Sequence, residues 1–343
     1  MKKAFIYQKK YFYEKVLVLK KNAEISKITN RKIQCYFRVS IPKKGGERII
    51  YCINPSCNLR TLQQNLQRNF LNRIPIPNNV FGFKKGYSYK DFLEPHVNKN
   101  YYLRVDIKDF FNSISKELIY DVLTNYLKMD EADNKEVLDT VFDIVSLHGK
   151  IPQGAITSPS IANVIFRQID MRIKKYCKVF NVEYTRYADD MLFSSDNEYL
   201  LKPYFIKKIA KILFSKGFRI NSSKIKKSNN GQIVLNGFVI SDSLSISRKR
   251  LSDIQRVLFL YQKGGAPVSI SIFLDRINSE QYLYRKKMNG KYFPTRGSLI
   301  DYLSGYRAFL IQWLPEDKNS NVYEKLTTLI NRIQYLLINI EEI

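Results

Sequence analysis

Three aspartates in this sequence have the type and spacing that phosphoryl-transfer chemistry requires. Asp106 ends a run of strand-forming residues, and Asp189 and Asp190 are adjacent within a second such run, residues 186–193. Neighbouring carboxylates in apolar surroundings repel one another and are costly to desolvate, so cations usually relieve them. Mg²⁺ takes such oxygen ligands, and two ions about 3.5–4 Å apart support in-line phosphoryl transfer. A turn or a helix cap is the alternative interpretation of an isolated Asp-Asp pair.

The elements expected around these aspartates alternate between strands and helices. A strand over 101–107 carries the first aspartate, and a hairpin over 182–195 carries the other two near its bend. Ser115 is a plausible N-cap for a helix that ends near Leu127. Further helices are expected at 134–147, 163–176 and 201–216, and further strands at 217–221 and 232–247.

The two ends of the chain differ from this middle part. A basic helical segment is expected at 1–35, a strand–turn–strand at 36–53, a helix at 58–72 and a loop at 74–89. Beyond residue 250, apolar residues repeat at helical spacing in three stripes, which indicates a small helical subdomain whose stripes pack as core. The predicted fold class is α+β. Two or three subdomains are expected, because a single core stops growing near ~250–300 residues.

The charge of the chain points to a polyanionic partner. Lys and Arg number 57 against 31 Asp and Glu, a net charge of +26, and the excess is concentrated in residues 1–50 and 201–250. Nucleic acid is the leading candidate and an anionic membrane surface the second. Tyr and Phe are plentiful, at 24 and 21 residues, and some of them could stack on bases. Charge alone does not separate an enzyme from a passive RNA-binding protein.

Several classes of protein are disfavoured by composition. No apolar run approaches the ~18 residues that a membrane span needs, and the N-terminal residues lack the core of a signal peptide. The cysteines include no Cys-x-x-Cys pair, so reduced thiols in a cytoplasmic protein are the simplest expectation. Two histidines, His96 and His148, are too few for most histidine-based metal sites. The four cysteines are Cys35, Cys52, Cys57 and Cys177.

Ordered motifs around the aspartates resemble those of a known family. An aromatic residue, Phe111, follows Asp106 by five positions, and residues 148–159 and 161–163 lie between the two acidic sites. This order resembles the bacterial reverse transcriptases of retrons, group II introns and defence systems, over about residues 36–250, and looks closest to the retron enzymes. The resemblance implies a right-hand polymerase. Its parts would be N-terminal helices and fingers at 1–100, an antiparallel palm sheet packed on helices at 101–247, with fingers helices between its acidic motifs, and a helical thumb at 248–343.

The resemblance also implies roles for individual residues. Asp106, Asp189 and Asp190 would hold two Mg²⁺ ions with the backbone of Ile107, and Phe111 would exclude a ribose 2′-OH. The triphosphate and nucleotide pocket would be formed by Lys43, Lys44, Arg48, Ile107, Lys108, Phe111, Gln153, Gly154 and Lys224. RNA and primer contacts would come from His96, Leu235, Asn236 and Gly237. A solvated turn is the alternative for Lys44 and Arg48, a merely basic neighbourhood for Lys224, core packing for Phe111, and a structural role for His96.

Two strings typical of retron enzymes are altered here. Of the usual Asn-Ala-x-x-His string only His96 is kept, and Val-Thr-Gly is replaced by Leu-Asn-Gly at 235–237. The expected function is an RNA-directed DNA polymerase that copies a structured non-coding RNA, primed from a 2′-OH, into branched RNA–DNA (msDNA). Its expected partners are that RNA and its DNA product, dNTPs and an effector or toxin protein of an anti-phage defence system, with no membrane. Another defence-associated or abortive-infection reverse transcriptase with a different primer, or a catalytically idle RNA-binding scaffold, are the alternatives. The oligomeric state is left open.

Overall fold

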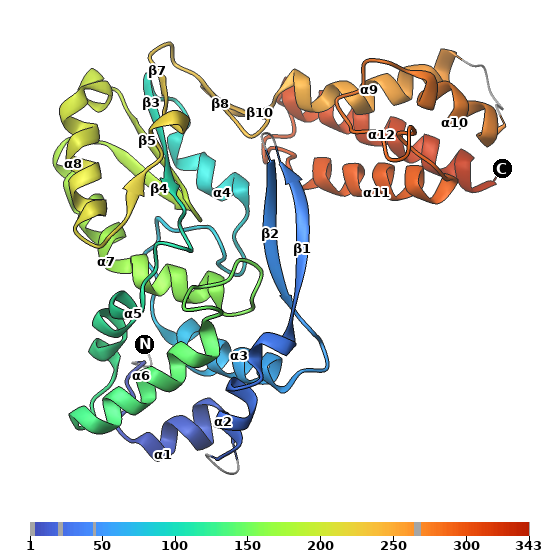
Figure 1. The fold of residues 1–343 in the computed structure, drawn as a ribbon. Helices are drawn as coiled ribbons and strands as arrows, with labels where there is room; N and C mark the ends of the chain where they lie inside the picture. Colours follow the sequence, from blue (N-terminus) through green and yellow to red (C-terminus); the bar gives the residue numbers. More distant parts are fainter. Residues whose placement is uncertain (1–3, 20–22, 44–45, 264–268, 343) are drawn as a thin grey trace. The chain divides into compact units, whose positions relative to one another are not determined.

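The computed structural model describes residues 4–19, 23–43, 46–263 and 269–342. The chain is mixed α+β and divides into two compact units, residues 1–232 and 233–343. Residues 233–247, which the sequence groups with the sheet, cluster in this division with the C-terminal helices. Figure 1 shows the elements of each unit. None of the described helices is both long and apolar enough to cross a bilayer.

An antiparallel sheet forms the centre of the first unit. Its strands run in the order β4, β5, β3, β6, and β7 also pairs with β3. The bounds are β3 (Tyr101–Lys108), β4 (Glu183–Tyr187), β5 (Asp190–Ser195), β6 (Arg219–Ile220) and β7 (Lys226–Ser228). Both the strand 101–107 and the hairpin 182–195 are therefore confirmed, and they are neighbours in the sheet.

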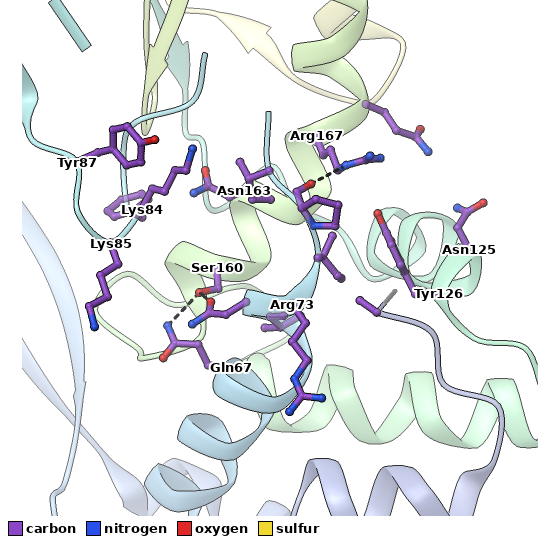
Figure 2. A pocket seen from close by; sticks show the side chains of 18 of the residues that line it. Gln67, Arg73, Lys84, Lys85, Tyr87, Asn125, Tyr126, Ser160, Asn163 and Arg167 are labelled. Atoms are coloured by element: carbon purple, nitrogen blue, oxygen red, sulfur yellow. Dashed lines mark hydrogen bonds between the residues drawn. The ribbon is translucent and has the colours of Figure 1, made fainter. Parts of the chain in front are cut away.

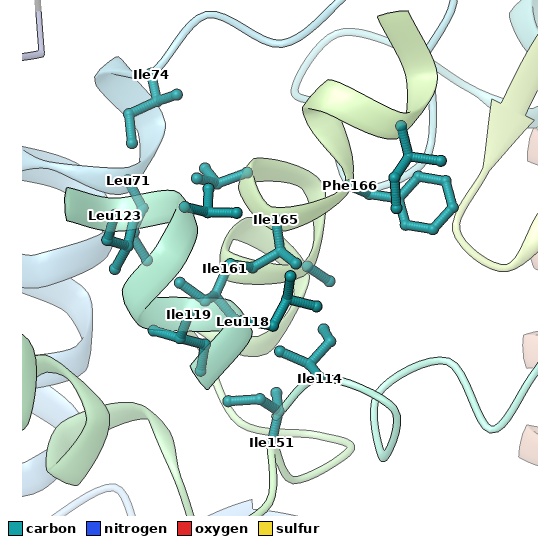
Figure 3. Close-up of a cluster of buried hydrophobic side chains, with 14 of the residues drawn as sticks. Leu71, Ile74, Ile114, Leu118, Ile119, Leu123, Ile151, Ile161, Ile165 and Phe166 are labelled. Carbon is teal, nitrogen blue, oxygen red and sulfur yellow. The ribbon is translucent and has the colours of Figure 1, made fainter. Parts of the chain in front are cut away.

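Helices cover this sheet and share one apolar core with it. The longest of the unit is α7 (Ser158–Val179), which packs against β4 and α8 (Pro203–Phe214). Ser115 does cap a helix, because its hydroxyl accepts a hydrogen bond from the Leu118 amide at 3.2 Å. Figure 3 shows apolar side chains of α5, α7 and the segment after α3 meeting in this core. Four further helices of this unit are α3 (Asn58–Asn69), α4 (Tyr89–Leu93), α5 (Lys116–Leu123) and α6 (Glu131–Val145).

The N-terminal part combines short helices with a two-stranded hairpin. Strands β1 (Tyr36–Lys43) and β2 (Gly46–Ile53) pair antiparallel, as the strand–turn–strand expectation requires. Before them lie α1 (Lys9–Tyr11), a π-helical turn (Phe12–Val16) and α2 (Ala23–Thr29). Short 3₁₀ turns occur at Lys32–Cys35, Leu71–Arg73, Glu94–His96, Thr124–Tyr126, Glu198–Leu201 and Ser222–Lys224.

One cysteine expectation is wrong. Cys35 and Cys57 form a disulfide, with their Cα atoms 5.7 Å apart, whereas Cys52 and Cys177 are free. Cys35 precedes β1 and Cys57 follows β2, so the bond closes the base of the hairpin. The local sequence carries no signal for this pairing, because it arises only when the two strands fold back on each other.

In its described residues, the second unit joins a three-stranded sheet to four helices. The sheet has the order β10, β9, β8, with β8 (Ile233–Leu235), β9 (Phe238–Ile240) and β10 (Leu244–Ile246). The helices are α9 (Arg248–Lys263), α10 (Ile270–Ser279), α11 (Arg296–Gln312) and α12 (Asn321–Glu342). The three apolar stripes correspond to α9, α11 and α12 and pack into one core. Helix α10 was not expected from the sequence.

Candidate active site

Strand register brings the three aspartates of the first unit together. Asp106 in β3 lies directly opposite Asp190 in β5, and Tyr187 pairs with Asp190 at the end of the β4–β5 hairpin. The hairpin turns through Ala188, whose φ is +57°, and Asp189. The Ile107 amide donates a hydrogen bond to the Asp189 carbonyl at 3.0 Å, which fixes the turn against β3.

Burial and the neighbouring charges act together on the pKa of the Asp189 carboxyl. Burial is the first cause that raises the pKa of Asp189, and the negative charge of Asp190 is the second. The charge of Asp106 acts in the same direction, whereas Lys224 lowers this pKa. Three mutually repelling carboxylates at one edge of a sheet are the kind of site that demands cations.

Two basic side chains supply positive charge at these carboxylates. The Lys224 ammonium lies 2.9 and 3.1 Å from the two carboxylate oxygens of Asp106. Arg104 donates to the Asp190 carboxylate through Nε at 2.9 Å and also through Nη2. Asn221 donates to Asp106 at 3.2 Å. Sequence reasoning missed Arg104 and Asn221. The alternation of side chains along β3 could have identified Arg104, because Arg104 lies two residues before Asp106 and therefore on the same face of the strand.

The donor chemistry of this site fits divalent metal ions. Carboxylate oxygens are the ligands that Mg²⁺ prefers, and Lys224 and Arg104 already show that the aspartates attract cations. Among the described residues, however, no group of three or more acidic, histidine or cysteine side chains is arranged ready to hold a metal. The aspartates therefore lie near one another, and metal binding by them would require side-chain rearrangement.

A buried polar network packs against the turn through Ala188 and Asp189 and supports it. The Arg186 guanidinium and the Asp170 carboxylate of α7 form an ion pair of 2.7 Å in which both side chains are fully buried. Arg186 also donates to the Ala188 carbonyl at 2.9 Å and to the Asn163 side-chain oxygen at 3.1 Å. Tyr184 donates to Asp170 at 2.7 Å. The network ties the backbone of the acidic turn to helix α7, and sequence reasoning did not find it.

The loop before α4 packs against the same turn. Arg186 donates its amide to the Asn79 carbonyl, and Phe81 donates its amide to the Arg186 carbonyl, both at 2.9 Å. Gly82 approaches so closely that a Cβ there would lie 2.3 Å from the Ala188 nitrogen. Only glycine fits at this position, because any side chain would displace the turn.

The expected nucleotide-pocket residues are partly brought together. The Tyr51 amide of β2 donates to the Gln153 carbonyl at 2.7 Å, so the hairpin lies against the Gln153–Gly154 turn. Gly154 has φ +103°, and a Cβ there would lie 2.2 Å from Ile50 Cγ2. Arg48 is exposed on the same strand, two residues before Ile50. Lys43 ends β1, whereas Lys44 lies outside the described residues.

The residues after Asp106 differ in exposure. Ile107 is buried and its amide is already used, so only its carbonyl remains to contact a metal or a triphosphate. Lys108 is exposed. Phe111 is half-buried, with its ring centroid 5.4 Å from that of Phe110 and 6.2 Å from that of Phe83. A half-buried ring fixed by aromatic neighbours is compatible with a steric gate.

His96 does not contact solvent in this structure. The side chain is fully buried, and its two ring nitrogens form 2.7 Å hydrogen bonds with the hydroxyls of Ser194 and Thr185. Burial lowers the pKa of His96 to about 3, so the ring is neutral. The expectation of an RNA contact by His96 is therefore wrong for this conformation, and the structural alternative holds.

The hairpin 235–237 lies in the second unit. Leu235 is buried, while Asn236 and Gly237 have φ of +49° and +85° and form the turn between β8 and β9. Arg250 of α9 donates to the Asn236 carbonyl at 2.8 Å and covers the Phe238 ring at 4.7 Å. The Phe238 ring stacks on Trp313 at 3.8 Å. The hairpin is thus held rigidly on the C-terminal helices.

A family model and several curated proteins match much of this chain. The family model described as reverse transcriptase (RNA-dependent DNA polymerase) matches residues 41–254. The retron Ec86 reverse transcriptase of Escherichia coli is 30% identical over 226 residues, which cover 63% of this chain and 67% of that protein. The retron Ec73 reverse transcriptase of Escherichia coli is 30% identical over 238 residues, which cover 65% and 74%. The solved apo telomerase of Candida tropicalis has a TM-score of 0.48 at 12% identity, covering 89% of this chain and 62% of that chain.

Proposed function

Because the chain belongs to the reverse transcriptase (RNA-dependent DNA polymerase) family and is related to retron enzymes, we propose that it copies a structured non-coding RNA into DNA. The observation that carries this proposal is the register of Asp106 opposite Asp190, with Asp189 in the adjoining turn. These are the acids that sequence analysis assigned to a two-metal site. Enzymes of this family generally use divalent metal ions.

Two Mg²⁺ ions would be held by Asp106, Asp189 and Asp190 with the Ile107 carbonyl. When bound, the ions would lower the pKa of the attacking hydroxyl and neutralise charge on the triphosphate. The chain's own cations act on the same charge. Lys224, released from Asp106, would neutralise the departing pyrophosphate, because a fixed ammonium stabilises developing phosphoryl charge.

The incoming dNTP would be enclosed by two further parts of the first unit. Lys43, Lys44 and Arg48 of the β1–β2 hairpin would contact its triphosphate, assisted by Lys108. Gln153 and Gly154 would line its base, which is supported by the hydrogen bond between this turn and β2. Phe111 would reject a ribose 2′-OH by steric clash.

The division into fingers, palm and thumb, the primer and the biological role belong to the same proposal. Fingers with the N-terminal helices would occupy 1–100, the palm 101–247 and the thumb 248–343, with Leu235, Asn236 and Gly237 gripping the primer. Synthesis would begin from a 2′-OH of the RNA and give branched RNA–DNA. The protein would act in the cytoplasm, in an anti-phage defence system with an effector protein.

The experiment that tests the function is sequencing of nucleic acid that co-purifies with the full chain, before and after debranching. One small RNA joined to DNA through a 2′ branch is expected. Unbranched or protein-linked DNA would instead indicate another defence-associated reverse transcriptase. Asp189→Asn is the matched control and should yield RNA without DNA. If it left DNA synthesis and cellular function intact, the chain would be an RNA-binding scaffold and the polymerase proposal would fail.

A further inference from the structure

A large cavity in the first unit borders the site described above, through Phe83, Asn163 and Tyr187, but none of the three aspartates lines it. Its volume is about 1510 Å³, and it lies among the end of α3, the loop before α4, the start of α7, the 3₁₀ turn Thr124–Tyr126 and the N-terminal segment. Figure 2 shows Lys84, Lys85 and Tyr87 on one side of it and Asn125 and Tyr126 on the other. The cavity is larger than the ~300–1,000 Å³ usual for small ligands.

The walls of this cavity carry positive charge only. Arg73, Lys84, Lys85 and Arg167 line it, and none of its lining residues is acidic. Within the described part of the chain, none of these four cations forms an ion pair with a carboxylate. Arg73 and Lys85 are exposed. Four cations without anionic partners around one hollow favour a ligand with several negative charges.

The uncharged part of the lining suits nucleobases. Aromatic rings come from five residues, of which Phe83 is 45% and Tyr87 44% exposed; the others are Phe5, Tyr126 and Tyr187. Exposed rings beside cations are the combination on which unstacked bases are held, at about 1–3 kcal/mol per base. Gln168 is exposed and its side-chain amide can bond the edge of such a base, whereas the Nδ2 and Nε2 groups of the lining residues Gln67, Asn125 and Asn163 already donate to backbone carbonyls.

We propose that this cavity binds an unpaired stretch of RNA, with bases stacked on Tyr87 and its neighbouring rings and phosphates on the cations. A duplex does not fit these features, because its bases are already stacked inside and offer no free faces. The cavity is lined by none of the aspartates and none of the residues assigned to the dNTP. It shares only Tyr187 with the hairpin that carries the acids. The inference rests on the proposed function for the choice of RNA as ligand.

The test measures binding of a short fluorescent single-stranded RNA to nuclease-treated full-length protein, without metal or dNTP. Arg73→Ala with Lys85→Ala should weaken binding about tenfold. It should also reduce the slope of log affinity against log salt by roughly 1.4, since each phosphate contact on a single strand contributes about 0.7. The matched control is Lys207→Ala with Lys211→Ala, which removes two exposed cations of α8 away from the cavity. Binding of the control should stay within about twofold of the parent.

A second measurement reads stacking directly. A 2-aminopurine base in the same RNA should be quenched on binding, and Tyr87→Leu should remove most of the quenching. The proposal would be overturned if the control variant weakened RNA binding as much as Arg73→Ala with Lys85→Ala does. It would also be overturned if Tyr87→Leu had no effect on the quenching, or if duplex RNA competed for binding as well as single-stranded RNA. Preference for single-stranded DNA over RNA would assign the cavity to the product and overturn it too. Because no DNA is made in these assays, failure of the polymerase proposal would leave their outcome unchanged.

Discussion

Arg186 and Asp170 form an ion pair that no solvent reaches, directly beneath the turn that carries Asp189. The pair joins the strand before the acidic turn to the middle of α7, and its guanidinium also binds the turn's Ala188 carbonyl. A buried pair contributes little net stability, but removing one partner leaves an uncompensated charge. We therefore interpret the pair as a fixed support for the position of the acids.

Asp170→Asn should lower the free energy of unfolding by about 3–5 kcal/mol, because it leaves the Arg186 charge buried without its partner. Chemical denaturation measures this change. Asp121→Asn, which breaks the exposed Lys216–Asp121 pair, is the control and should cost under about 1 kcal/mol. Similar losses in the two variants would contradict the special role of the buried pair.

Lys224→Met should change both the metal requirement and the rate of DNA synthesis. Without an ammonium 2.9 Å from Asp106, less Mg²⁺ should be needed for half-maximal rate, since no side-chain cation competes at that carboxylate. The maximal rate should fall on the order of tenfold to a hundredfold, because a positive charge is lost near the departing group. A Mg²⁺ titration of the rate separates the two effects. Unchanged values for both would remove Lys224 from the site, and Lys224→Arg should retain most of the rate.

Phe111→Ala should admit ribonucleotides. Loss of the ring removes the surface that a 2′-OH would meet, so the preference for dNTP over rNTP should fall by about a hundredfold or more. Single-nucleotide incorporation with each substrate measures this ratio. Phe205→Leu is the control, since Phe205 is buried in the core beside Tyr176 and Phe193 and should affect stability instead. A variant that rejects ribonucleotides as well as the parent does would show that Phe111 is only a packing residue.

Gly154→Ala should push the hairpin away from the Gln153–Gly154 turn. The new Cβ would meet Ile50 Cγ2 at 2.2 Å, and the backbone has φ +103°. We expect a higher KM for dNTP, by about tenfold, and Ile50→Ala in the same chain should recover part of it. Gly149→Ala is the control, because Gly149 has φ +71° but no neighbouring atom within 4 Å. An equal rise in KM for the control would assign the effect to backbone strain alone.

His96 should make the protein acid-sensitive. Burial lowers its pKa in the folded state to about 3, while an unfolded histidine titrates near 6.5. As the pH falls, His96 is therefore protonated in the unfolded state before it is protonated in the folded state. The stability that His96 contributes is complete above about pH 6.5 and declines below it, by up to about 1.4 kcal/mol per pH unit. Denaturation of the parent and of His96→Gln across this range measures the difference, and identical slopes would contradict a buried neutral ring.

Most helices and strands follow from the local sequence, with α10 as an exception. Alternation and helical spacing report on the local backbone, so the strand 101–107, the hairpin 182–195, the Ser115 cap and the three C-terminal stripes were predictable. The order of motifs around Asp106 and Asp189 was sufficient to identify the family. These features depend on neighbours within a few residues along the chain.

The contacts between side chains that are distant in the sequence become visible in the folded structure alone. Lys224 forms an ion pair with Asp106, which is 118 positions away in the sequence. Arg186 of β4 pairs with Asp170 of α7. Cys35 forms a disulfide with Cys57, on the far side of the β1–β2 hairpin. His96 shows the same limit, because its spacing matches a family string while packing places it between Ser194 and Thr185. Such pairings depend on how the helices pack on the sheets and on which polar groups are buried next to one another. A local pattern carries no information about either.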